Sequence, residues 1–177
     1  MSWMQSGIRL MYRRYSLDWD VHEQVTIIQA SQARVIVKVR RRFISGWSLY
    51  PFQDRHLQSM MLTVDRQTGK VFKTEIHPFY RRLWLNPHVT IGESIPVSIR
   101  IGDPTELLFT VKGQELITVD MNHFNCWRFE ASFQDKHYRM WYDNQYGLRI
   151  RFEAMRWISQ HQFSAHTVWQ LQQVHMN

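Results

Sequence analysis

The chain contains a single cysteine, Cys126, among its 177 residues. One cysteine excludes an intramolecular disulfide framework and leaves no cysteine-based zinc cluster. Stability must therefore come from packing, and a hydrophobic content of 44% over this length is enough to bury a core. We expect one compact domain that spans residues 1–177.

Glycine and proline are scarce, with 7 and 5 residues, and no Ser-, Gly- or Pro-rich stretch interrupts the chain as a flexible linker would. No run reaches the about 18 apolar residues of a membrane-spanning helix, so no membrane span is expected. The start, MSWMQSGIRLMYRRY, lacks the apolar centre of a signal peptide. We expect a cytoplasmic protein, with the bacterial envelope as the alternative if a leader peptide has been removed.

Motifs for catalysis and metal binding are missing as well. None of the nine histidines occurs as His-x-His or His-x-x-x-His, although this spacing tests only ligands that are close in sequence. No nucleophile elbow, phosphate-binding glycine loop or dinucleotide fingerprint is present. Cys126 lies near His123 and His137, but a lone cysteine within a strand behaves as a small hydrophobe. We predict a non-enzyme with no catalytic residue, metal site or cofactor.

What the chain does have is alternation of apolar and polar residues with period two, which is typical of β-strands. It predicts strands at 7–19, 21–28, 33–43, 60–65, 71–77, 97–101, 107–112, 115–120, 126–133, 137–142 and 148–154. Turns are expected at 66–70 and at Gly113–Gln114, because glycine there suits a hairpin. Residues 79–86 read equally as strand or helical turn, and 158–177 favour a last strand.

These runs predict an all-β fold, a strongly curved antiparallel sheet or incomplete β-barrel meander of about nine to eleven strands, with one short helix allowed for. Its backbone is the stretch 124–157, where Trp127 and Trp141 are expected on opposite faces of the sheet. A sheet that is aromatic on both faces needs cover on both, or it curls around an apolar space. The candidate ligand-binding residues on the concave face are Trp127, Phe129, Phe133, Tyr142, Leu148, Ile150 and Phe152.

A second candidate site lies on residues 33–43, where valines alternate with cations. Arg34, Lys38, Arg40 and Arg42 share the face opposite the valines. With Lys and Arg at 22 against Asp and Glu at 15, such a ladder suits phosphates, and nearby aromatics suit unpaired bases. The plainer interpretations are an edge strand that uses charge to prevent pairing, or an ordinary solvated surface. The loop 45–58, with Trp47, Tyr50 and Phe52, either covers the core or rims a cleft.

The phrases VKGQELITV, FNCWRFE, YRMWYD and GLRIRFE resemble the half-barrel bacterial proteins similar to lipoprotein carriers. In that family a strand ending in Trp-Tyr, a turn, and then Gly-Leu with an alternating arginine strand recur. The resemblance covers the last third of the chain and the turn at 65–69, and it departs from the family in lacking a leader and a lipobox cysteine. It implies a sheet wrapped partway round a helix or an apolar groove, and a fold more than an activity.

The functional expectation is a non-enzymatic binding module. Its first form holds an apolar small molecule or a partner's apolar segment on the concave face. Its alternative form binds single-stranded nucleic acid through Arg34, Lys38, Arg40 and Arg42. The oligomeric state is left open.

Overall fold

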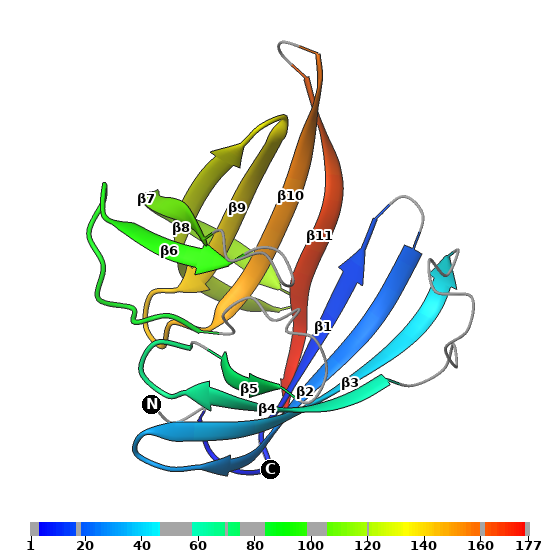
Figure 1. Ribbon diagram of the computed structural model, residues 1–177, viewed down its shortest axis with the longest axis vertical. Helices are drawn as coiled ribbons and strands as arrows, with labels where there is room; N and C mark the ends of the chain where they lie inside the picture. Colours follow the sequence, from blue (N-terminus) through cyan, green and yellow to red (C-terminus); the bar gives the residue numbers. More distant parts are fainter. Residues whose placement is uncertain are drawn as a thin grey trace.

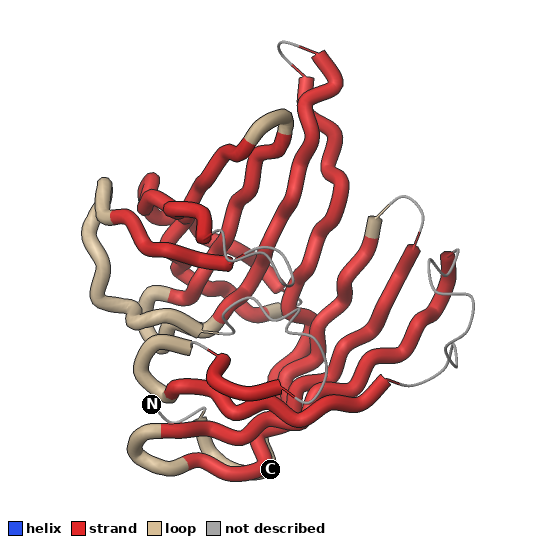
Figure 2. The backbone as a smooth tube through the Cα atoms, viewed as in Figure 1, coloured by secondary structure: helices blue, strands red, loops and turns tan. Residues whose placement is uncertain are grey.

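The computed structural model of the protein describes residues 4–16, 19–46, 58–69, 71–74, 84–98, 106–119, 121–159 and 162–175. Every regular element within these ranges is a β-strand, and no helix occurs among them. Strands, red in Figure 2, make up most of the described chain. The predicted all-β class is confirmed.

Eleven strands form one antiparallel sheet. They are β1 (Arg9–Tyr15), β2 (Trp19–Ala30), β3 (Arg34–Gly46), β4 (Gln58–Asp65), β5 (Val71–Thr74), β6 (Ser94–Ser98), β7 (Glu106–Val119), β8 (Asn122–Phe133), β9 (Lys136–Asp143), β10 (Arg149–Ser159) and β11 (Gln162–His175).

The strand order is β5-β4-β3-β2-β1-β11-β10-β9-β8-β7-β6. Neighbours in the sheet are therefore neighbours in the chain, except that the first and last strands pair with each other. This is the order of an up-and-down barrel opened between β5 and β6, and the sheet is not closed. Figure 1 shows two wings that meet at the β1–β11 seam: the first wing is β1–β5 and the second wing is β6–β11.

The hydrophobic core lies on one face of the sheet, which we call the inner face; the opposite face is the outer face. A single cluster of buried side chains joins both wings, from Val25, Val37 and Leu62 to Phe109, Met140 and Phe152. Side chains of two wings of one bent sheet meet only on its concave side, so the inner face is concave. The outer face is convex.

Residues 84–87, which we call the strap, connect the two wings across the inner face. The indole Nε1 of Trp84 donates a hydrogen bond to the carbonyl of Arg66, 2.8 Å away in the turn after β4. The amide of Leu85 donates to the carbonyl of Gly147, 2.8 Å away between β9 and β10. Trp84 and Leu85 are both buried, so the strap contributes to the core and ties a turn of each wing to it.

Two glycines leave room for the strap. Gly69 and Gly147 both have φ of +70°, a conformation that costs other residues steric energy. A Cβ on Gly69 would overlap the carbonyl oxygen of Trp84, and one on Gly147 would overlap that of Leu85. Both close approaches involve backbone atoms, so no side-chain rotation relieves them.

The predicted hairpin at Gly113–Gln114 is wrong. β7 runs without interruption through both residues, and the pairing of β7 with β8 shifts register between Val111 and Gly113. Glycine inside a strand often marks such a bulge, where the pairing admits one extra residue. Gly113 therefore bends a long strand and does not end it.

Three further expectations have different outcomes. The last strand is confirmed, because β11 pairs with both β10 and β1. The strand predicted at 97–101 begins earlier, at Ser94, and includes Pro96; β6 is an edge strand, where proline is tolerated. The loop aromatics Trp47, Tyr50 and Phe52, and residues 79–83, lie outside the described residues.

Replacing Gly69 or Gly147 by alanine should destabilise the protein more than replacing Gly92. All three have positive φ, and that alone costs about 1–2 kcal/mol for a residue with a Cβ. A Cβ at Gly92 meets nothing within 4 Å, whereas at the other two it forces the strap to move, for about 1–3 kcal/mol more. Urea unfolding measures the difference, and three equal losses would show that the strap does not stabilise the fold.

Candidate functional site

The seven residues predicted to hold an apolar ligand all border the core. Five of them are at most 5% exposed: Phe129, Tyr142, Leu148, Ile150 and Phe152. Their rings contact one another or other core rings, as in the edge-to-face pair of Phe129 and Tyr142, whose centroids lie 5.8 Å apart. In the described structure these five side chains act as packing.

Trp127 and Phe133 differ, because they are only partly buried against the core. The indole Nε1 of Trp127 donates a hydrogen bond to the carbonyl of Pro87 in the strap, at 3.0 Å. Trp127 pairs across strands with Tyr142, and Trp141 pairs with Arg128, so the two tryptophans face opposite sides of the sheet as predicted.

A charged cluster lies under the seam on the inner face, where the sequence pattern predicted none. Arg41 Nε lies 2.7 Å from the carboxylate of Glu23, and both side chains are almost fully buried. Fully buried Arg149 places its guanidinium 3.9 Å from the ring centroid of Trp169 and 5.0 Å from that of Tyr12. Burial raises the pKa of Tyr12 above its ordinary range, although the positive charge of Arg149 opposes this. The phenol therefore stays protonated and donates to the carbonyl of Arg149.

Cys126 is fully enclosed, and its thiol has no nucleophilic character. Burial, followed by the carboxylates of Asp143 and Glu115, raises the pKa of Cys126 to about 12. Because the thiolate is the reactive form, the side chain stays a protonated, inert thiol at neutral pH. Its Sγ lies 3.5 Å from the carbonyl of Phe124.

The basic strand is not at an edge. β3 pairs with β2 on one side and with β4 on the other, which removes the interpretation that its cations prevent edge pairing. Val35, Val37 and Val39 are fully buried on the inner face. Their alternation places Lys38, Arg40 and Arg42 on the outer face, as predicted.

Three neighbouring strands build this part of the outer face. Across β2, Lys38, Arg40 and Arg42 stand opposite Thr26, Gln24 and His22. On the other side of β2, Thr26, Gln24 and His22 stand opposite Arg9, Met11 and Arg13 of β1. We call Arg9, Lys38, Arg40 and Arg42, with the β2 residues between them, the outer basic face. Arg9 was not among the predicted residues, although its alternation with Ile8 and Leu10 is the signal that places it here.

The cations of the outer basic face have no acidic partners in the part of the chain that the structure describes. No carboxylate of the described residues lies within ion-pair distance of Arg9, Lys38, Arg40 or Arg42. Arg13, by contrast, is paired with Asp20 at 2.8 Å. The fourth predicted residue, Arg34, shares the outer face by the same alternation, but it stands at the start of β3 opposite Asp65 and does not line the concavity described below.

The side chain of Asp65 accepts hydrogen bonds from residues of its own turn. Its Oδ1 accepts hydrogen bonds from the amides of Gln67 and Thr68 and from the Thr68 hydroxyl, at 2.6–3.0 Å. Burial would raise the pKa of Asp65, but the hydrogen bonds from Thr68 and Gln67 outweigh it and the pKa is lowered. The carboxylate therefore stays ionised, and the hydrogen bonds that hold it come from its own turn.

The outer basic face is hollowed. A shallow concavity of about 340 Å³ is lined by Arg9, Gln24, Thr26, Ile28, Lys38 and Arg40. Three of its six residues are cations and none is acidic. Gln24 Nε2 donates a hydrogen bond to Thr26 Oγ1 at 3.0 Å, which orients the amide at the centre of the hollow.

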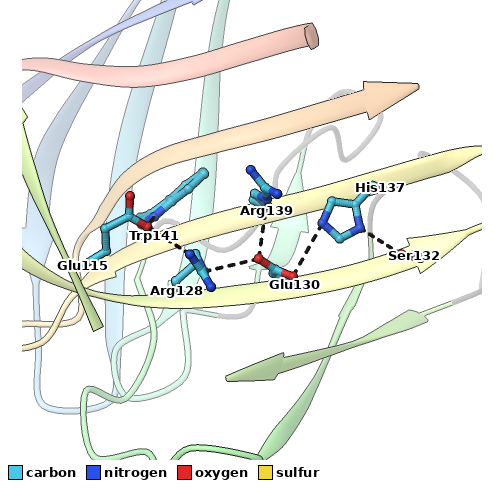
Figure 3. Close-up of polar contacts among 7 residues, drawn as sticks. All are labelled: Glu115, Arg128, Glu130, Ser132, His137, Arg139 and Trp141. Carbon is cyan, nitrogen blue, oxygen red and sulfur yellow. Dashed lines mark hydrogen bonds and ion pairs between the residues drawn. The ribbon is translucent and has the colours of Figure 1, made fainter. Parts of the chain in front are cut away.

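The second wing also carries cations on its outer face, but there they are matched by glutamates (Figure 3). Arg128 lies 3.2 Å from Glu130 and 3.5 Å from Glu115. Arg139 also lies 3.5 Å from Glu130. Trp141 Nε1 donates to Glu115 at 2.9 Å. Figure 3 shows these groups linked across β7, β8 and β9, so both arginines lie beside a glutamate.

His137 ends this network. Its Nδ1 lies 2.8 Å from Ser132 Oγ and its Nε2 lies 3.6 Å from Glu130. Serine, histidine and glutamate in contact are the parts of a hydrolytic triad, but a triad also needs a substrate cleft with oxyanion donors. Ser132 is exposed on an open strand face, so we assign the three residues to cross-strand pairing.

Replacing His137 by glutamine should change how stability depends on pH. Burial lowers the pKa of His137 below 6.5, helped by Arg139 and Lys112 and opposed by Glu130. The folded state therefore favours the neutral ring, and the stabilisation is lost as pH falls through the unfolded pKa of about 6.5. Unfolding at pH values from about 8 to 5 should show wild type losing stability relative to His137→Gln. A wild type that gains stability on acidification would indicate that the Glu130 pair dominates.

Replacing Arg41 by methionine should cost about 3 kcal/mol of unfolding free energy, because it leaves Glu23 buried without that cation. The matched control is Arg156→Met, which breaks the exposed pair with Asp135 at 2.6 Å and should cost less than about 1 kcal/mol. Urea unfolding of both variants measures the contrast. Equal costs would mean that the buried ion pair contributes no more to the unfolding free energy than the exposed pair does.

Among the described residues no group of three His, Cys, Asp or Glu gathers as metal ligands would. No helix in the described ranges is long and apolar enough to cross a membrane.

No protein-family model, curated protein or solved structure matches this chain.

Proposed function

We propose that the protein is a non-enzymatic binding module that holds single-stranded nucleic acid on its outer basic face. The observation that carries the proposal is the cluster of Arg9, Lys38, Arg40 and Arg42 on interior strands, without acidic partners among the described residues. Uncompensated cations on one face attract phosphates and raise the rate of encounter with a polyanion.

The contrast between the wings supports a ligand more than a solvated surface. Both wings alternate cations on their outer faces, yet Arg128 and Arg139 on the second wing share Glu130. Four cations therefore gather on the outer face of the first wing where no carboxylate of the described residues pairs with them. Keeping like charges close together without partners costs electrostatic free energy, and a bound polyanion would recover it.

The shape of the face favours a single strand over a duplex. The outer face is convex and so is a duplex, and two convex surfaces touch over a small area. A flexible single strand can follow the sheet and place its phosphates beside the cations. Half-buried Met11 and Tyr15, and exposed Ile28, offer apolar contact to bases on the same face.

An apolar ligand on the inner face is the second candidate. It is supported by Trp127 and Phe133, which keep partial exposure beside the strap. The five other predicted residues are already packed, so such a ligand would have to displace part of the chain's own core.

Anisotropy of a fluorescent single-stranded oligonucleotide tests the proposal. The double variant Lys38→Gln/Arg40→Gln should weaken binding at low salt and reduce the slope of log K against log salt by about 1.4, or about 0.7 for each phosphate contact. The matched control Arg139→Gln/Arg156→Gln lowers the net charge of +7 by the same two units and should bind nearly as wild type does. Equal weakening in both pairs, or no wild-type binding at low salt, would reject the outer basic face as the site.

A further inference from the structure

The cations of the outer basic face lie in two parallel rows, one of three cations on β3 and one on β1 that consists of Arg9 alone. Lys38, Arg40 and Arg42 are alternate residues of β3, so their Cα atoms are about 6.7 Å apart along the strand. Arg9 lies two strands away on β1, which runs in the same direction as β3 because both are antiparallel to β2. Adjacent strands are about 4.8 Å apart, so the rows are separated by about 10 Å.

The strip between the rows is polar and uncharged apart from histidine. β2 contributes His22, Gln24 and Thr26 to it, one opposite each cation of β3. Gln24 and Thr26 line the concavity. Their hydrogen bond uses one N–H of the Gln24 side-chain amide, so its second N–H and its carbonyl oxygen can bond a ligand. The outer basic face is therefore a shallow trough, with three cations along the β3 side, Arg9 on the β1 side and hydrogen-bonding groups along its floor.

Resting on the proposed function, we infer that a single strand lies along β2 with successive phosphates on Lys38, Arg40 and Arg42. The spacing of alternate residues on a strand is close to that of successive phosphates in an extended polynucleotide. Arg9 closes the trough from the other side. Gln24 and Thr26 bond the sugars or the base edges that face the floor.

A path across the strands fits less well. Crossing the sheet from β3 at Arg42 meets His22, then Arg13, which is already paired with Asp20. Beyond the seam the same line reaches Gln170 and Arg151, and Arg151 is paired with Glu153. Of the four cations without an acidic partner among the described residues, three follow the direction of β3 and only Arg9 lies across the sheet from them.

This arrangement separates two kinds of contact, which respond differently to salt. Phosphate contacts release counterions, so removing one lowers the magnitude of the salt slope by about 0.7 for single strands. Contacts to sugars and bases release none. Lys38→Gln, Arg40→Gln and Arg42→Gln should each reduce the slope by that amount. Gln24→Ala and Thr26→Val should weaken binding several-fold and leave the slope unchanged.

The experiment measures oligothymidine binding by anisotropy for lengths of about two to twelve nucleotides, at several salt concentrations. Affinity should rise steeply up to about four nucleotides, which span three phosphates, and only gradually beyond. Arg156→Gln, on the second wing, is the control that should leave the slope unaltered. Thermal unfolding of every variant checks that each one is folded.

Two kinds of failure are distinguishable. If the wild type binds no oligonucleotide at low salt, or binds vesicles of acidic phospholipid more tightly, the proposed function itself is overturned. If the wild type binds but Arg156→Gln lowers the slope as much as Arg40→Gln does, binding is diffuse and only the trough is overturned. A change of the salt slope in Gln24→Ala or Thr26→Val would likewise overturn only the trough.

Discussion

The structure depends on the strap, because an open sheet of eleven strands has no closing pair between its edges. β5 and β6 lie at opposite ends of the strand order, so the ladder alone does not fix the angle between the wings. The hydrogen bonds from Trp84 to Arg66 and from Leu85 to Gly147 connect a turn of one wing to a turn of the other. At each turn a backbone carbonyl of the strap also lies too close to the chain for a Cβ, which is why glycine stands there. The strap thus supplies to an incomplete barrel the constraint that closure supplies to a complete one.

The seam where the chain's two ends pair has a different chemistry. Here the inner face carries the ion pair of Glu23 with Arg41, and Arg149 over the rings of Trp169 and Tyr12. Buried charges tolerate little displacement, because each needs its partner at contact distance. Glu23 and Arg41 lie on β2 and β3, and Arg149 and Tyr12 lie on β10 and β1, so a one-residue slip of β2 against β3, or of β1 or β10 against β11, would separate them. Hydrophobic side chains alone would allow more sliding, and the cluster therefore favours one register.

The sequence was sufficient for the fold class because its strands alternate, and period two survives any arrangement of the strands. It also placed Lys38, Arg40 and Arg42 on one face, since alternation is a local property. The sequence was insufficient where a contact between distant residues determines the local conformation or the burial of a side chain. Gly113 has the composition of a turn, and only its pairing with Arg128 shows a bulge. Arg149 looks like a surface cation until Trp169, twenty residues on, is seen to cover it. The concave face was found, but whether its aromatics are covered depends on the strap, which the pattern left undefined.

The two outer faces show why charge balance and not charge content indicates a site. Both wings place arginines on alternate outward positions, and each wing viewed alone would suggest a basic surface. On the second wing Glu130 stands between Arg128 and Arg139. Both cations pair with this one glutamate, which links β8 to β9. On the first wing the positions between the cations are Thr26, Gln24 and His22, none of which is an anion. The first wing has one such outer pair, Arg13 with Asp20, but none of the described carboxylates pairs with Arg9, Lys38, Arg40 or Arg42. The proposed binding of nucleic acid rests on this imbalance, because a bound polyanion would supply the missing negative charge.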